Sequence, residues 1–260
     1  MKDHLMRLIR YRGLLWTLAL GELKARHRQT ALGVLWALVQ PVSMMLVFLT
    51  VFSVFVKVPV EGVSYAVFAY TGLLSWLFFA NSLSLGSSSI VANMSLITKA
   101  SFPREVIPLS RVLTVSFDFL VGATILGVLL ILSEVPVSFA WLAVPGILAI
   151  QIMFTTGLVL LVSALYALKR DIGSLLPLIL QIWMFLSPVV YPVQVIPEQY
   201  RTLYMVNPMA MILEAYRNTL LRGTLPPPEL IVPSLTLASV ALVMGYVYFK
   251  AVELRFADVM

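Results

Sequence analysis

The sequence predicts an all-α integral membrane protein with six transmembrane helices, an amphipathic interface helix before the first, and a helical hairpin between the fifth and sixth. Two observations support this fold class. The 260 residues are 60% hydrophobic and only 12% charged, with a mean hydropathy of +0.97. In addition, several apolar stretches of about twenty residues are long enough to cross a hydrocarbon core of about 30 Å. Such a composition excludes an ordinary soluble domain.

The charge balance indicates a membrane surface. The formal net charge is +6, and the basic residues cluster beside apolar spans. Anionic lipid headgroups explain this placement better than a nucleic acid, which requires a continuous basic face. The chain has no cysteine, so disulfides and thiolate metal sites are excluded.

Residues 1–30 are predicted to form the amphipathic helix, lying along the cytoplasmic interface. Their one apolar run, Leu14 to Leu20, is too short to span, and it is followed by Lys24, Arg26 and Arg28. Apolar residues recur here at three- and four-residue spacing, and the charges fall mostly elsewhere. The alternative is that these charges act only as a positive topology signal.

The first predicted span runs from Gly33 to Val56, with Pro41 as an expected kink, and the second runs from Tyr65 to Val91. Small polar residues gather in the second half of the second span. Such residues usually mark close helix packing, which we favour here, although they can also line a polar conduit.

A charged, proline-broken segment, Leu96 to Pro108, separates the second span from the third. We call this segment the charged island. It has to lie at a membrane face because unpaired backbone amides are costly in hydrocarbon, and Lys99 and Arg104 predict that this face is cytoplasmic. The presence of Leu96, Ile97 and Phe102 among the charges favours a docking surface, and an interhelical loop with snorkelling ends is the alternative.

The third and fourth spans are predicted from Leu109 to Leu132 and from Phe139 to Leu168. The third contains Asp118, seven residues after Arg111 and on the same helix face. An intramembrane carboxylate is a functional hypothesis by default, but so close to the cytoplasmic boundary we expect it to be paired or snorkelling.

The fifth span is predicted from Ser174 to Tyr191 and the sixth from Leu230 to Phe249. The segment between them has too many charges to span but has an apolar face, and Asn207-Pro208 divides it into two short helices. With six spans, four of the 18 Lys and Arg residues lie outside, namely Lys57, Arg201, Arg217 and Arg222. This asymmetry predicts that both termini are cytoplasmic.

Three blocks resemble the type-2 ABC exporter permeases for polysaccharides, a family that includes O-antigen, capsule and teichoic-acid exporters. They are Arg26 to Pro41, Gly72 to Arg111, and Leu186 to Pro192 followed by Leu203 to Leu221. The resemblance covers nearly the whole chain, including its length and its order of apolar segments.

The resemblance implies one transmembrane domain over residues 1–260, with an interface helix (1–30), a coupling helix (95–105) and a periplasmic gate hairpin (198–225). It implies an inner-membrane permease that works as a homodimer with two ATPase subunits and exports a lipid-linked polysaccharide, most closely an O-antigen. ATP and Mg would be bound by the ATPase, and no cofactor by this chain. A capsule exporter, a teichoic-acid exporter and a drug permease of the same superfamily are alternatives.

Three groups of site residues follow from the resemblance. The ATPase-coupling residues are Ser95, Leu96, Ile97, Lys99, Phe102, Pro103, Arg104 and Glu105. The expected conduit residues are Phe48, Phe52, Phe55 and Tyr191, although each aromatic also fits an ordinary core or lipid-facing position. The expected gate residues are Tyr200, Tyr204, Asn207 and Pro208.

Motifs for catalysis are absent from the sequence. It contains no Gly-x-x-x-x-Gly-Lys-Ser/Thr phosphate loop, no Gly-x-Ser-x-Gly elbow and no histidine cluster, so we expect neither catalytic nor metal-binding residues. A membrane-embedded transferase is therefore a weaker alternative. An ion-coupled carrier is a third alternative, and it is weakened because midplane charges are nearly absent apart from Asp118.

Overall fold

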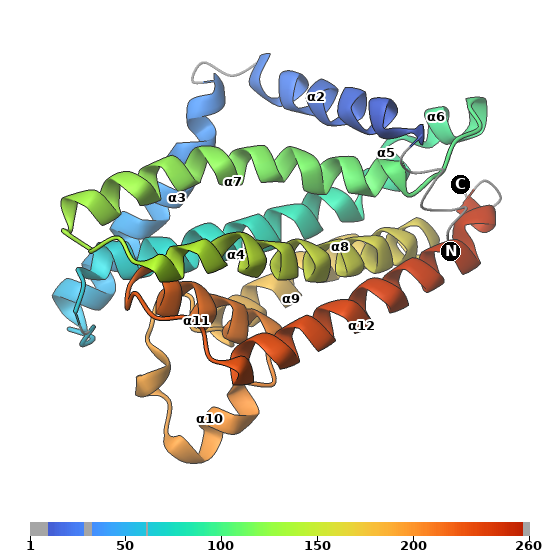
Figure 1. Cartoon of the computed structure of the whole chain (residues 1–260). Helices are drawn as coiled ribbons and strands as arrows, with labels where there is room; N and C mark the ends of the chain where they lie inside the picture. The colour runs from blue at the N-terminus through green and yellow to red at the C-terminus, as the bar shows by residue number, and fades with distance from the viewer. Residues whose placement is uncertain (1–9, 29–32, 61, 257–260) are drawn as a thin grey trace.

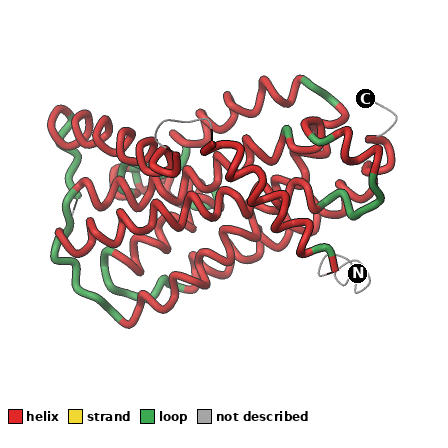
Figure 2. The backbone as a smooth tube through the Cα atoms, turned by 90° about the horizontal axis from the view of Figure 1, so that it is seen from above, coloured by secondary structure: helices red, strands yellow, loops and turns green. Residues whose placement is uncertain are grey.

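The computed structural model describes residues 10–28, 33–60 and 62–256, and within these ranges it contains helices and no strand. The long helices lie side by side along one axis (Figures 1 and 2). The α-helices are α2 (Arg12–Arg28), α3 (Trp36–Phe48), α4 (Tyr65–Ser87), α5 (Ser89–Ala92), α6 (Met94–Lys99), α7 (Val106–Leu132), α8 (Val144–Leu168), α9 (Asp171–Phe185), α10 (Glu198–Tyr204), α11 (Pro208–Leu220) and α12 (Pro228–Val252). A π-helix, η2 (Leu49–Phe55), continues α3, and short 3-10 helices are η1 (Gly33–Leu35), η3 (Phe139–Ala143), η4 (Val193–Val195) and η5 (Glu253–Arg255).

Five helical stretches in the described residues are long and apolar enough to cross a membrane, which makes this a multi-pass helical membrane protein. They are Trp36–Phe55, Tyr65–Ser87, Val106–Leu132, Phe139–Leu168 and Pro228–Arg255. These match five of the six predicted spans. The remaining one is the shorter apolar helix α9, whose 15 residues rise about 23 Å.

Helix α9 ends earlier than predicted. We expected the fifth span to reach Tyr191, but α9 stops at Phe185 and the chain continues in turns around Pro188. Proline has no backbone N–H to donate, and it disfavours helical geometry in the residue before it. The turn therefore leaves backbone carbonyls that other side chains have to satisfy.

Glycines bring the central helices close together. A Cβ atom on Gly157 of α8 would collide with the backbone of Ala241 and Leu242 in α12, and one on Gly245 of α12 would collide with the backbone of Gly157. Small residues allow such backbone contact in membrane proteins, where helix association depends on packing. Helices α8 and α12 consequently form a tight pair (Figure 1).

The two ends of the bundle carry different elements. At one end, the loops flanking α3, α7 and α11 meet, since Ser64 Oγ lies 3.3 Å from Ser133 Oγ and Ser138 Oγ donates to the carbonyl of Gly223 at 2.8 Å. We call this the hairpin end. At the other end, α5 and α6 lie beside the start of α2 and the end of α12 (Figure 1). We call this the island end.

Helix α2 confirms a helix within the first thirty residues, while residues 1–9 and 29–30 lie outside the described part. It packs along α7, with the rings of Trp16 and Phe117 5.6 Å apart and Thr114 Oγ1 donating to the carbonyl of Ala19 at 3.3 Å. Arg111 of α7 forms an ion pair with Glu22. Helix α2 thus packs on α7 through part of its apolar surface, while about half of Trp16 and much of Leu20 stay exposed.

Candidate functional site

The charged island has an exposed face and a buried face. Ser95 and Lys99 are exposed, and Leu96 is half-buried. Ile97 is buried in an apolar cluster with Phe249 and Phe256 near the end of α12, and Phe102 packs partly buried against the same cluster. The exposed face is free for a partner, and the buried face joins the island to α12.

Charged contacts reinforce this joint. The carboxylate of Glu105, which is 1% exposed, accepts a hydrogen bond from Lys250 Nζ at 2.7 Å, and Lys250 also reaches Glu253 at 3.0 Å. Arg104 donates to the backbone carbonyl of Glu253. Two of the predicted coupling residues, Arg104 and Glu105, therefore bind α12 and η5 within the chain, and Pro103 lies half-buried beside them.

A cavity of about 730 Å³ lies between the island, the residues that lead into α2 and the end of α12 with η5. It is lined by both basic and acidic side chains, from Arg10 at the start of the described chain through Lys99 and Arg104 to Lys250 and Glu253. A recess of this size and mixed charge suits a polar protein segment better than an apolar ligand.

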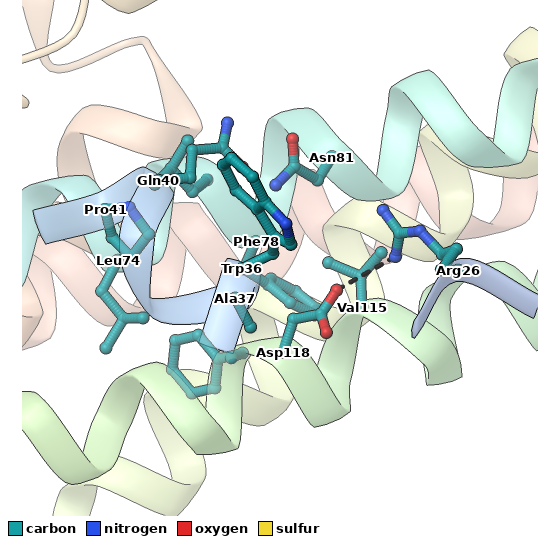
Figure 3. Close-up of a pocket in the computed structure, with 12 residues that line it drawn as sticks. Arg26, Trp36, Ala37, Gln40, Pro41, Leu74, Phe78, Asn81, Val115 and Asp118 are labelled. Carbon is teal, nitrogen blue, oxygen red and sulfur yellow. Dashed lines mark hydrogen bonds and ion pairs between the residues drawn. The ribbon is translucent and has the colours of Figure 1, made fainter. Parts of the chain in front are cut away.

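A second cavity, of about 460 Å³, lies where α2, α3, α4 and α7 meet, and polar side chains interrupt its mainly apolar lining (Figure 3). Arg26 of α2 donates to Asp118 Oδ2 of α7 at 3.1 Å, and Gln40, Asn81 and Trp36 line the same space (Figure 3). The expectation that Asp118 is paired is confirmed. Its partner comes from α2, whereas Arg111, on the same face, pairs with Glu22.

Three of the small polar residues in the second half of the second span are buried. Ser82, Ser87 and Ser89 are at most 4% exposed, and the hydroxyls of Ser87 and Ser89 donate to backbone carbonyls one turn earlier. Gly86 lies against Val159 of α8. This arrangement supports the packing interpretation for these residues, while Asn81 lines the cavity of Figure 3.

The three phenylalanines predicted for the conduit do not share one environment. The rings of Phe48 and Phe52 lie 5.9 Å apart, and Phe52 stacks on Tyr65 of α4 at 6.5 Å, so this pair packs against the bundle. Phe55 is 73% exposed. The reason is the π-helix η2, whose hydrogen bonds span five residues instead of four and so rotate later side chains away from the α-helical register.

The predicted gate residues meet the end of α9. The hydroxyls of Tyr191 and Tyr204 lie 2.5 Å apart, and Tyr191 also donates to the carbonyl of Phe185 at 2.6 Å. Tyr200 is 54% exposed on α10 and takes no part in this contact. Tyr191, predicted for the conduit, thus lies with the hairpin residue Tyr204.

Asn207 is the main link between the hairpin and the turn after α9. Its Nδ2 donates to the carbonyl of Leu186 at 3.0 Å and to Ser187 Oγ at 2.8 Å, and its Oδ1 accepts from Trp183 Nε1 at 3.0 Å. The same oxygen caps α11 by accepting from the backbone N–H of Met209 at 3.0 Å. Pro208 occupies the first turn of α11, where a missing N–H costs nothing.

Helix α11 enters the bundle, in agreement with the expected break at Asn207-Pro208. Tyr216 Oη donates to Gln151 Oε1 of α8 at 3.0 Å, and Gln151 Nε2 donates to the carbonyl and hydroxyl of Ser75 in α4 at 2.8 and 2.9 Å. All three side chains are buried. A closed polar network therefore ties α11 to α8 and α4, while α10 has no buried residue.

Arg217 of α11 is 1% exposed. Its Nη2 donates to the carbonyl of Val189 at 2.8 Å, and its guanidinium carbon lies 3.8 Å from the centre of the Phe68 ring. Burial lowers the pKa of Arg217 to about 10, and the Glu214 carboxylate opposes this shift, so the side chain stays charged at neutral pH.

Sequence reasoning missed the roles of Lys250, Arg217 and Arg26. From the sequence, Arg217 counts only as one of the four charges outside, and nothing singles out Lys250. For Arg217 a signal existed, because it lies beside Leu213 and Tyr216 on the apolar face of its helix. For Lys250 there was none, because its partner Glu105 is 145 positions away.

Comparison with known proteins gives a consistent result. A family model described as ABC-2 type transporter matches residues 13–221. The O-antigen export system permease protein RfbA of Myxococcus xanthus is 33% identical over 253 residues, covering 95% of this chain and 94% of the relative. The protein of the same name from Klebsiella pneumoniae is 29% identical, with 92% of each chain covered. The polysialic acid transport protein KpsM of Escherichia coli is 24% identical over 79% of this chain and 80% of its own length. These matches confirm the resemblance seen in the three sequence blocks, and the chain belongs to the ABC-2 type transporter family.

Proposed function

We propose that this chain is the membrane permease subunit of an ATP-driven exporter that moves a lipid-linked polysaccharide, most closely an O-antigen, from the cytoplasm to the periplasm. The observation that carries the proposal is the two-faced charged island, which exposes Ser95 and Lys99 and holds Glu105 against α12. The relatives described above support the substrate class, and those named for O-antigen export are more similar than the polysialic acid transport protein.

In this proposal the island end faces the cytoplasm, together with both termini. The excess of Lys and Arg at that end supports the orientation. The hairpin formed by α10 and α11 then lies on the periplasmic side, where Tyr204, Asn207 and Tyr191 gate the exit and Tyr200 faces outward.

The island transmits force in two steps. A separate ATPase subunit, which binds ATP and Mg, contacts the exposed face, and its closure displaces the island. Glu105, Lys250 and Arg104 pass this displacement to α12, which is packed backbone to backbone against α8. This chain of rigid contacts supports coupling between the partner surface and the spans, because packed interfaces move as units.

Two copies of the chain form the conduit between them, with one ATPase subunit under each. Helix α9 supports a homodimer, because apolar side chains cover its outward face: Leu175, Leu178, Ile179, Ile182 and Phe185. Phe55 and the partly buried Phe48, Phe52 and Tyr191 supply the aromatic surface near this path. Sugar rings stack on aromatic faces without tight hydrogen bonds, which allows a polymer to slide.

The test is reconstitution with the ATPase encoded by the neighbouring gene, followed by measurement of complex formation and ATP hydrolysis. Lys99→Glu reverses the charge of the exposed face and is expected to weaken complex formation at least about tenfold if this lysine contacts the ATPase. Lys169→Glu is the matched control, since Lys169 is also exposed but belongs to another loop.

Lys250→Gln separates docking from coupling. It leaves the exposed face unchanged, so the complex with the ATPase is expected to form normally. ATP hydrolysis is expected to continue without driving transport of a lipid-linked glycan into proteoliposomes. Absence of any ATPase complex with the wild-type chain would refute the exporter assignment. If Lys99→Glu and Lys169→Glu weakened complex formation equally, the exposed face of the island would not be the docking surface, but the exporter assignment would stand.

A further inference from the structure

The hairpin end contains a buried cation whose hydrogen bonds are incomplete. Arg217 donates one bond, from Nη2 to Val189, but its Nε and Nη1 atoms are buried and have no hydrogen-bond partner in the described part of the chain. The nearest carboxylate oxygen, on Glu214, lies 4.0 Å from Nη1. Leaving donors of a buried charged group unpaired is costly, so such a group calls for an explanation.

The charge around Arg217 is unbalanced as well. Arg222 approaches the other oxygen of Glu214 at 2.5 Å and also contacts Asn218. Two guanidinium groups thus share one carboxylate among the described residues. The cluster has one positive charge in excess, and a buried charge without compensation is strongly unfavourable.

A small cavity adjoins both arginines. It measures about 280 Å³ and is lined by Arg217 and Arg222 on one side and mainly by apolar side chains elsewhere, including Val60, Val63 and Val195. Ligand pockets commonly measure about 300–1,000 Å³. This cavity therefore suits a headgroup but not a sugar polymer.

We propose that this cavity binds the phosphate group of a lipid, with the exposed Arg222 donating to the phosphate oxygens, the buried charge of Arg217 attracting them from behind the wall, and the valines contacting the apolar part of the molecule. Guanidinium groups match phosphate geometry because their N–H donors form a planar fork that pairs with two oxygens at once. The apolar walls favour a lipid over free phosphate. The site's periplasmic location rests on the function proposed above, whereas phosphate binding itself does not.

Gly72 is part of the construction of this site. A Cβ atom at this position would collide with the carbonyl of Val189 and would lie 2.9 Å from Arg217 Nη2. Because residue 72 of α4 has no side chain, Arg217 can approach the turn after α9. The buried guanidinium is held from α4, α11 and this turn together.

The test measures lipid binding to the purified chain in detergent by native mass spectrometry, without the ATPase, so that its result is independent of the exporter assignment. The probes are dioleoylphosphatidylglycerol, dioleoylglycerol, which lacks the phosphate, and inorganic phosphate. We expect phosphatidylglycerol to bind at least about tenfold more tightly than dioleoylglycerol, because charge-assisted hydrogen bonds are the strong ones.

Arg222→Gln is the informative variant, because its side chain is 43% exposed and glutamine keeps an N–H donor toward Glu214 and Asn218. We expect it to weaken phosphatidylglycerol binding about tenfold or more. Lys57→Gln is the control, since Lys57 is an exposed cation that does not line the cavity, and it is expected to bind as the wild type does. Arg217→Gln is expected to abolish binding if the variant folds.

Three outcomes would overturn the proposal. Equal binding of the two lipids would show an apolar site, and inorganic phosphate binding as tightly as the phospholipid would show that no lipid is required. The third involves Glu61, which lies outside the described residues but between Val60 and Gly62 in the sequence. If phospholipid binds only after Glu61→Gln, the chain's own carboxylate occupies the site.

Discussion

Each end of the bundle contains a cluster of charged side chains, and the two clusters differ in how their buried charges are compensated. At the island end, Lys250 pairs with both Glu105 and Glu253, so each of these carboxylates has a cationic partner, and the side chain of Lys250 keeps 20% of its surface exposed. At the hairpin end, Arg217 and Arg222 share Glu214, and Arg217 is 1% exposed.

The comparison shows how composition and burial decide what a charge cluster does. A cluster that contains its own counter-charges joins two segments without a further ion, and because Glu105 is buried, breaking its pair with Lys250 is costly. A buried cation in an unbalanced cluster needs either a bound anion or a rigid surrounding that holds it. The island end is therefore suited to joining two segments firmly, and the hairpin end to holding a ligand.

The largest effect is expected from Gly72→Ala, which disturbs the rigid surrounding of Arg217. The new methyl group displaces the carbonyl of Val189 and the guanidinium, and we expect a loss of about 3 kcal/mol in the free energy of unfolding. The measurement is a denaturant titration in mixed micelles. Gly127→Ala is the control, because no neighbouring atom lies within 4 Å of its added Cβ atom. Equal stability of the two variants would mean that Arg217 is not held by close packing.

The next effect concerns the cluster at the island end. Glu105→Gln keeps the shape of the side chain but removes its charge, and we expect a loss of about 2 kcal/mol, the scale of a charge-assisted hydrogen bond. Glu253→Gln provides the comparison, because its carboxylate side chain is 22% exposed and it is expected to lose less. The same titration measures both. A larger loss for Glu253→Gln would contradict the view that burial sets the strength of this joint.

A smaller effect is expected at the hairpin. Asn207→Ala removes the N-terminal cap of α11 and the bonds to the turn after α9, and a lost cap costs about 1 kcal/mol. Thermal unfolding monitored by tryptophan fluorescence is suitable, because Trp183 donates to Asn207 in the wild type. Asn207→Asp retains the capping oxygen and is expected to recover part of the loss. No recovery would assign the effect to the side-chain amide donor instead.

The smallest effect is expected where α2 meets α7. Arg26 and Asp118 have side chains that are 34% and 20% exposed, and pairs of this kind contribute about 0.5 kcal/mol. Arg26→Gln should therefore change stability little. A double-mutant cycle with Asp118→Asn measures the coupling directly, and a coupling energy near 3 kcal/mol would place this pair among the buried clusters.

Much of the fold was predictable because it depends on local properties. Apolar stretches of about twenty residues located five spans, and Asn207-Pro208 located the break between α10 and α11. Two local features escaped prediction. The first is the π-helix η2, which places Phe55 in a different environment from Phe48 and Phe52. The second is the end of α9 at Phe185, since Pro188 disfavours helical geometry in the residue before it.

For the candidate sites, the sequence alone located the charged island and the hairpin, since charge, proline and asparagine break apolar runs wherever they fold. Only the tertiary structure decided which charges meet. Glu105 and Lys250 are separated by 145 positions, Arg26 and Asp118 by 92, and Arg217 reaches Val189 across 28. Sequence patterns report which face of a helix is apolar, but the partner of a charge depends on how helices pack together, and packing is a property of the whole bundle.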